Sequence, residues 1–190
     1  MKTFIFVYEG CALYEVVFSA LLCSYSSHVA TVGLTRDKVV TSEGIGVVPD
    51  LSVNDLNAFG ADQLVIPGGS PEPACHDSRI VGLIQRLDMA GNTIAAICAG
   101  PFFLAVAGIM DKRRYTVSRD RAFSKEFEGG VFVDRDIVRD ENIITAQGSS
   151  YLELAMLLAK ETGAFDGEED ERVTYMTLKN TSYEGDYPVP

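Results

Sequence analysis

Short apolar runs alternate with helix-like patterns along most of the chain. The runs contain little polar surface on either alternating face, which is typical of strands buried on both sides of a sheet. These runs occupy residues 3–8, 29–34, 63–66 and 93–97. Apolar residues recur at helical spacing in 12–25, 78–87 and 101–107. Strands that alternate with helices in this way predict one doubly wound α/β domain with a mostly parallel sheet and helices on both faces.

The pattern changes in the second half of the chain. Short strands separated by charged residues are predicted at 115–117, 131–133, 137–138 and 143–145. A strongly apolar helix follows from 151 to 161, with Ser149 or Ser150 as its cap and Gly163 as its stop. We expect the domain to cover residues 1–164. Residues 165–190 are acidic and are predicted to form a C-terminal extension, docked or partly mobile.

One uncharged stretch, residues 93–110, is long enough for a short membrane span. Its first part is rich in β-branched and small residues, and Gly100-Pro101 interrupts its middle. These features favour a buried strand, a tight turn and a buried helix instead.

The charge and the histidine count exclude several classes of function. The chain has 190 residues and a formal net charge of −11, so phosphate backbones would repel it and nucleic-acid binding is not expected. Only His28 and His76 are available, which argues against histidine-rich metal sites, and we expect neither metal nor cofactor. Glu9 interrupts the N-terminal apolar run before a signal peptide is complete, so we expect a cytoplasmic protein without membrane partners.

Cys98 gives the sharpest chemical signal. It lies between a predicted buried strand and a helix with Pro101 in its first turn, among the small residues Ala99 and Gly100. This arrangement is typical of a nucleophile elbow. The N–H groups of the following helix are expected to favour the thiolate near neutral pH. The alternative is a buried structural cysteine.

Two further strand ends carry candidate residues. Gly68 and Gly69 follow the strand at 63–66, where their N–H groups can form an oxyanion hole or simply a turn. Glu15 lies among apolar residues in the first predicted helix. Burial there would raise its pKa and let it donate a hydrogen bond, whereas the alternative is a solvated helix residue.

Four segments together resemble the ThiJ/PfpI superfamily, which includes deglycases, intracellular proteases and amidases related to class I glutamine amidotransferases. The segments are YEGCALYE, VIPGG, AAICAGPFFLAVAGI and IITAQGSSYLELAMLLAKETG. The resemblance implies a flavodoxin-like fold and commonly a homodimer. It also implies that Cys98 is the elbow cysteine, that Glu15 is the acid hydrogen-bonded to it, and that Gly69 and Ala99 supply the oxyanion N–H groups.

The sequence departs from this family at the positions of its usual histidines. Protease-like members carry histidine directly after the cysteine, where this chain has Ala99. Deglycase-like members carry one in a T-x-H context, where this chain has Ser118. His76 and Glu72 lie in the loop beyond Gly69 and are possible substitutes, as is Ser118 itself. An exposed loop position is the alternative for His76, and an intracellular peptidase is disfavoured.

The leading hypothesis is therefore a reactive Cys98 that attacks a small electrophile such as an aldehyde, amide or isonitrile. Such a protein would act like a glyoxalase, amidase or hydratase through a thiolate adduct. A non-enzymatic redox or stress sensor is the alternative. Among the other cysteines, Cys11 is expected to border the pocket, Cys23 to pack in a helix and Cys75 to be a surface thiol.

Overall fold

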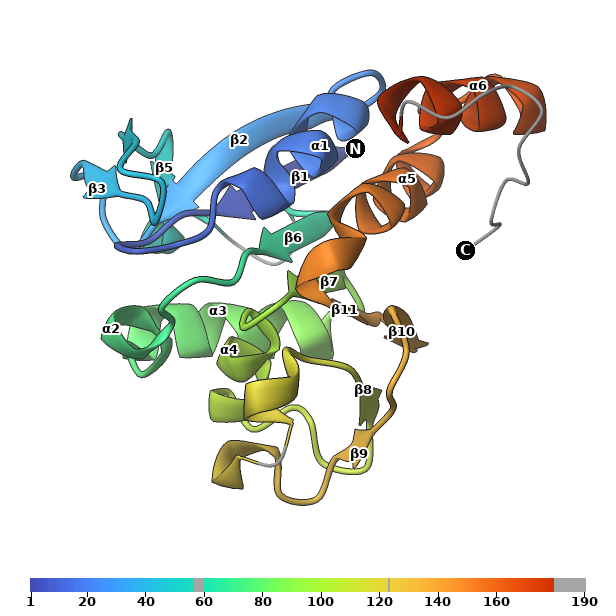
Figure 1. The fold of residues 1–190 in the computed structure, drawn as a ribbon. Helices are drawn as coiled ribbons and strands as arrows, with labels where there is room; N and C mark the ends of the chain where they lie inside the picture. The colour runs from blue at the N-terminus through green and yellow to red at the C-terminus, as the bar shows by residue number, and fades with distance from the viewer. Residues whose placement is uncertain (57–59, 123, 180–190) are drawn as a thin grey trace.

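A central sheet with helices on both faces organises the computed structural model, which describes residues 1–56, 60–122 and 124–179. The strand order is β10-β11-β7-β6-β1-β2-β5 (Figure 1). Every neighbouring pair is parallel except β10 with β11, so the predicted mostly parallel sheet is confirmed. The strands are β1 (Lys2–Phe6), β2 (His28–Gly33), β5 (Leu51–Ser52), β6 (Gln63–Ile66), β7 (Thr93–Ile97), β10 (Ile137–Asp140) and β11 (Ile143–Ala146).

Two small sheets flank the central one. The hairpin of β3 (Val39–Val40) and β4 (Gly46–Val47) is antiparallel. The pair of β8 (Arg114–Tyr115) and β9 (Val131–Phe132) is parallel, and each strand is shorter than the sequence pattern predicts.

Helices cover the sheet in two layers, with α1 and α5 on one face and α3 and α4 on the other (Figure 1). The helices are α1 (Tyr14–Cys23), α2 (Glu72–Cys75), α3 (Ser78–Met89), α4 (Pro101–Val106), α5 (Tyr151–Thr162) and α6 (Glu168–Lys179). Short 3-10 turns occupy Val53–Asp55, Arg119–Arg121, Lys125–Phe127 and Gly148–Ser150.

Helix ends agree with the sequence at some positions and not at others. Gly163 ends α5 in the left-handed conformation with φ 74°, as predicted. Ser150 occupies the N-cap of α5, but its side chain makes no capping bond. At α3 the cap is Asp77, whose carboxylate accepts the N–H of Arg79 at 2.9 Å.

The uncharged stretch at 93–110 forms a strand, a turn and a helix, as the Gly100-Pro101 interruption predicts. β7 ends at Ile97 and α4 begins at Pro101. Among the described residues, no helix combines the length and the apolar character that crossing a bilayer requires.

The acidic segment after residue 164 forms a helix that the sequence pattern did not predict. Tyr175 and Met176 of α6 are buried, and the Tyr175 hydroxyl donates to Glu153 of α5 at 2.8 Å. Lys160 of α5 pairs with Glu171 at 3.0 Å. These contacts hold α6 against α5, whereas residues 180–190 of the expected extension lie outside the described residues.

Two cysteines outside the predicted site are buried inside the fold. Cys23 packs in the core at the end of α1, as expected. The expectation that Cys75 is a surface thiol was wrong, because Cys75 is fully buried. It ends α2, and that short helix packs against α3 and α4, which covers the sulfur.

Candidate active site

Two predicted site residues, Glu15 and Cys98, lie with two glycines where four strands of the central sheet end. Glu15 follows β1, Gly68 follows β6, Cys98 follows β7 and Gly148 follows β11. Parallel neighbours present their carboxyl ends at one edge of the sheet, and ligand sites of such folds lie there. The topology alone therefore brings together residues that are far apart in the sequence.

Cys98 lies in a sharp turn between β7 and α4. Its φ of 60° is in the left-handed region, which is strained for a residue with a side chain. The backbone is held on two sides: the Cys98 N–H donates to Ala146 O at 2.9 Å, and the Cys98 carbonyl accepts the Ser118 N–H at 2.8 Å. Gly100 is required beside it, since a Cβ there would lie 2.5 Å from Ile66 O. The turn predicted at Cys98 is therefore present.

Glu15 is a buried carboxyl group beside the Cys98 sulfur. Its exposed fraction is 1%, and it forms a side-chain hydrogen bond with Cys98. The Gly68 N–H donates to Glu15 Oε2 at 2.7 Å, and the Tyr14 hydroxyl donates to Oε1 at 3.3 Å. The solvated alternative for this residue was wrong, because α1 packs against α5 and covers the Glu15 side chain.

The pKa values of both groups are raised. Burial raises the pKa of Glu15, although hydrogen bonds from Cys98, Gly68 and Tyr14 oppose the rise. Burial and then the Glu15 charge raise the pKa of Cys98 to about 12, with partial opposition from the Ala99 N–H. Two negative charges side by side repel each other, so ionisation of either group opposes ionisation of the other.

The expectation of a thiolate favoured by the helix N-terminus stays a prediction, and the raised pKa of Cys98 weighs against it. α4 has only six residues, and the Cys98 side chain at its start is half-buried. Desolvation and the neighbouring Glu15 carboxylate therefore outweigh the favourable backbone groups. Glu15 is placed to accept the thiol proton when Cys98 reacts.

The glycine pair after β6 lies directly against the elbow. A Cβ on Gly68 would lie 2.7 Å from Cys98 Cβ and 2.8 Å from Ala99 N. Gly69 has φ 104° and packs against the segment at 10–12, so only glycine fits there. Within the described residues, the Gly69 N–H has no hydrogen-bond acceptor, and the Ala99 N–H faces the Cys98 sulfur. The Ala99 N–H therefore lies beside the sulfur, and the role of Gly69 as a second donor stays a prediction.

Gly148 belongs to the site, although sequence reasoning did not single it out. A Cβ at this position would lie 3.1 Å from Cys98 Sγ and 3.3 Å from Glu15 Oε1. The only signal available was its place after the strand at 143–146, because a glycine before Ser149-Ser150 resembles an ordinary turn. The missing side chain leaves room over the sulfur.

We expect Gly148→Ala to slow alkylation of Cys98 by iodoacetamide by about tenfold, because the new methyl group crowds both reacting side chains. Rates are followed by intact-protein mass spectrometry. Gly82→Ala is the matched control, since its Cβ in α3 would meet only the flexible end of Arg86. An unchanged alkylation rate in a folded Gly148→Ala protein would contradict this role.

Of the other candidate residues, Ser118 contacts Cys98, whereas Glu72 and His76 form no hydrogen bond with it in the described part of the chain. Ser118 touches the Cys98 backbone, and its buried hydroxyl has no partner among the described residues. Glu72 pairs with Arg121 at 2.6 Å, and hydrogen bonds from its own backbone N–H and from Arg121 lower the pKa of its carboxyl group. His76 is exposed at the end of α2, and within the described residues it forms no hydrogen bond with Cys98 or Glu15.

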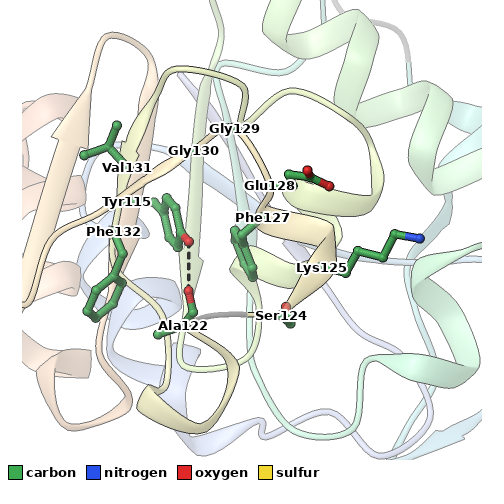
Figure 2. A pocket seen from close by; sticks show the side chains of 10 residues that line it. All are labelled: Tyr115, Ala122, Ser124, Lys125, Phe127, Glu128, Gly129, Gly130, Val131 and Phe132. Carbon is green, nitrogen blue, oxygen red and sulfur yellow. Dashed lines mark hydrogen bonds between the residues drawn. The ribbon is translucent and has the colours of Figure 1, made fainter.

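A cavity of about 640 Å³ lies elsewhere, over the β8–β9 pair. Figure 2 shows Tyr115, Phe127 and Phe132 along this cavity, with Gly129 and Gly130 in its wall. None of the predicted site residues lines it. Among the described residues, no cluster of three histidine, cysteine or acidic side chains is arranged to hold a metal ion.

Comparison with known proteins identifies the family of this chain. The DJ-1/PfpI family pattern matches residues 1–161. The glutathione-independent glyoxalase DJR-1.2 of Caenorhabditis elegans is 30% identical over 138 residues, which cover 70% of this chain and 72% of that protein. The uncharacterized protease YoaZ of Bacillus subtilis is 30% identical over 145 residues, which cover 74% and 69%.

Solved structures show the same fold. Drosophila melanogaster DJ-1beta aligns with a TM-score of 0.81 at 23% identity and covers 96% of this chain and 100% of its own. The thiJ/pfpI family protein from Bacillus anthracis aligns with a TM-score of 0.82 at 24% identity, covering 95% and 91%. The family match over most of the chain and the shared fold agree, and the chain belongs to the DJ-1/PfpI family.

Proposed function

We propose that the protein is a cysteine-dependent enzyme that acts on small carbonyl electrophiles, as a glyoxalase that needs no added thiol. The observation that carries the proposal is the hydrogen bond between the Cys98 thiol and the buried Glu15 carboxyl group, which places a nucleophile beside a base. A relative named as a glutathione-independent glyoxalase supports this choice of substrate, a 2-oxoaldehyde.

In the first step, Cys98 Sγ forms a bond to the aldehyde carbon as the thiol proton passes to Glu15. The carbonyl oxygen takes the displaced electron pair and accepts hydrogen bonds from the N–H groups of Gly69 and Ala99. Return of the proton from Glu15 to this oxygen gives a hemithioacetal and restores the carboxylate. The low polarity around Glu15 strengthens it as a base, because burial raises its pKa.

The second step is an internal oxidation and reduction. The Glu15 carboxylate removes the hydrogen from the carbon bonded to sulfur, and the electron pair forms an enediolate with the neighbouring carbonyl. Protonation of that neighbouring carbon gives a thioester of Cys98. Water cleaves the thioester to a 2-hydroxy acid and the free thiol. One carbon is oxidised and its neighbour reduced, so no external oxidant is needed.

The test is conversion of methylglyoxal to lactate by the purified protein with no added thiol. We expect stoichiometric lactate over many turnovers, measured by chromatography, with a rate that rises as pH passes through the raised pKa of Glu15. Cys23→Ala controls for loss of a thiol outside the site and should retain the activity. A folded protein that forms no lactate at millimolar methylglyoxal would refute the proposal.

A cysteine redox sensor is the second candidate. This role is favoured because an oxidant can reach Cys98, which is partly exposed. The other three cysteines, Cys11, Cys23 and Cys75, are buried. The raised pKa of Cys98 weighs against it, because peroxide reacts with the thiolate. Selective addition of two oxygen atoms to Cys98 under mild peroxide, lost in Glu15→Leu, would favour the sensor; an unmodified Cys98 would exclude it.

A further inference from the structure

Helix α1 has no capping residue of its own. Leu13 occupies the N-cap position and makes no side-chain cap. The free N–H groups of Leu13 and Tyr14 instead donate to the Glu43 carboxylate, at 3.3 Å and 3.2 Å. Glu43 lies about thirty residues later, in the turn of the β3–β4 hairpin. A carboxylate at this end of a helix satisfies N–H groups and complements the helix dipole.

The hairpin that carries Glu43 is fixed to the chain segment leading into α1. The Gly10 N–H donates to Val40 O at 2.8 Å, and the Ser42 N–H donates to Cys11 O at 2.9 Å. The Val40 N–H donates to the Glu9 carboxylate, also at 2.8 Å. Three bonds therefore hold the hairpin in place, and Glu43 reaches the helix from a defined position.

We infer that Glu43 is a positioning residue for the Cys98–Glu15 pair. Its carboxylate holds the Tyr14 N–H, and the hydroxyl of the same tyrosine donates to Glu15. Glu15 lies in the turn that Glu43 caps and must keep its bond to the Gly68 N–H. By holding the first turn of α1 in place, Glu43 keeps the Glu15 carboxyl group directed toward Cys98 Sγ. This inference rests on the proposed function only in taking Cys98 as the reacting thiol.

Glu43 also acts on the pair through its charge. Four titratable groups among the described residues face Glu15: the Cys98 thiol from the elbow, the Tyr14 hydroxyl from its own helix, Tyr8 from the segment after β1, and Glu43 from the hairpin. Burial tends to raise the pKa of Glu43, but hydrogen bonds from Thr41, Tyr14 and Leu13 outweigh it and leave the pKa lowered. Glu43 is therefore negative at neutral pH, and its charge helps to raise the pKa of Glu15.

Two substitutions separate the positioning role from the charge. Glu43→Gln keeps an acceptor oxygen for α1 and loses the charge, whereas Glu43→Ala loses both. In both variants the Glu15 carboxyl should titrate at lower pH, read from its side-chain ¹³C signal, which is assigned by its loss in Glu15→Gln. In Glu43→Ala, kcat should fall by about tenfold with KM within about twofold, and Glu43→Gln should recover most of that loss.

Glu128→Gln is the matched control, since it removes one exposed negative charge over the β8–β9 pair and should change neither readout. The ¹³C titration does not depend on turnover, so it tests the inference even if methylglyoxal is not a substrate. A Glu15 signal that titrates as in the wild type in both Glu43 variants, with α1 folded by circular dichroism, would overturn the inference. So would equal kcat values for wild type and Glu43→Ala where turnover is observed.

Discussion

Replacing Cys98 with serine should lower kcat/KM for methylglyoxal by at least about a thousandfold. A hydroxyl group is far less acidic than a thiol, so Glu15 cannot take its proton as the carbon bond forms. The change is nearly isosteric and leaves the oxyanion N–H groups in place, so it removes the nucleophile alone. Lactate formation at saturating and at low substrate gives kcat and kcat/KM separately.

Stability distinguishes loss of the nucleophile from loss of the fold. Cys98→Ser keeps a side chain at φ 60°, so the backbone strain of the elbow is unchanged and the free energy of unfolding should stay within about 1 kcal/mol of wild type. Retention of most of the turnover by a folded Cys98→Ser protein would exclude attack by this sulfur.

Glu15→Gln should speed the alkylation of Cys98 but slow the turnover of methylglyoxal. The pKa of Cys98 is raised to about 12, by burial first and then by the Glu15 charge. Removing the charge lowers that pKa, so alkylation by iodoacetamide at pH 8 should become about tenfold faster. Turnover should fall by about a hundredfold or more, because the amide cannot accept the thiol proton.

The alkylation rate of both proteins is measured from pH 6 to pH 11, with Glu128→Gln as a control for general loss of negative charge. The wild-type rate should still be rising at the top of this range, and the Glu15→Gln rate should level off at lower pH. Slower alkylation in Glu15→Gln would contradict the assignment, because it would mean that a protonated Glu15 stabilises a thiolate in the resting protein.

The strands next to the site could be predicted closely from the sequence. β6 and β7 have the predicted bounds, since each is a mostly apolar run followed by a turn. The turn at Cys98 was predictable for the same reason. By contrast, α6 carries few apolar residues in an acidic segment, and its helix depends on contacts with α5 that no local pattern shows.

The chemical state of the site was less predictable than its location. A thiolate was expected from the local helix, but the Cys98 pKa depends on burial and on Glu15, which is distant in sequence. Gly148 and Glu43 enter through tertiary contacts as well. Sequence patterns predict which residues lie at the end of each strand. The pKa of Cys98 depends instead on the groups that surround it in the folded chain.

Because residues from four strand ends surround Cys98, the acidity of its thiol depends on cooperative unfolding of the sheet. Glu15, Gly68 and Gly148 reach the sulfur only while β1, β6, β7 and β11 remain paired. No smaller part of the chain contains the complete environment of this thiol. A partly opened molecule that loses either half of the sheet therefore carries an ordinary cysteine, and the suppressed acidity of Cys98 is a property of the whole native state.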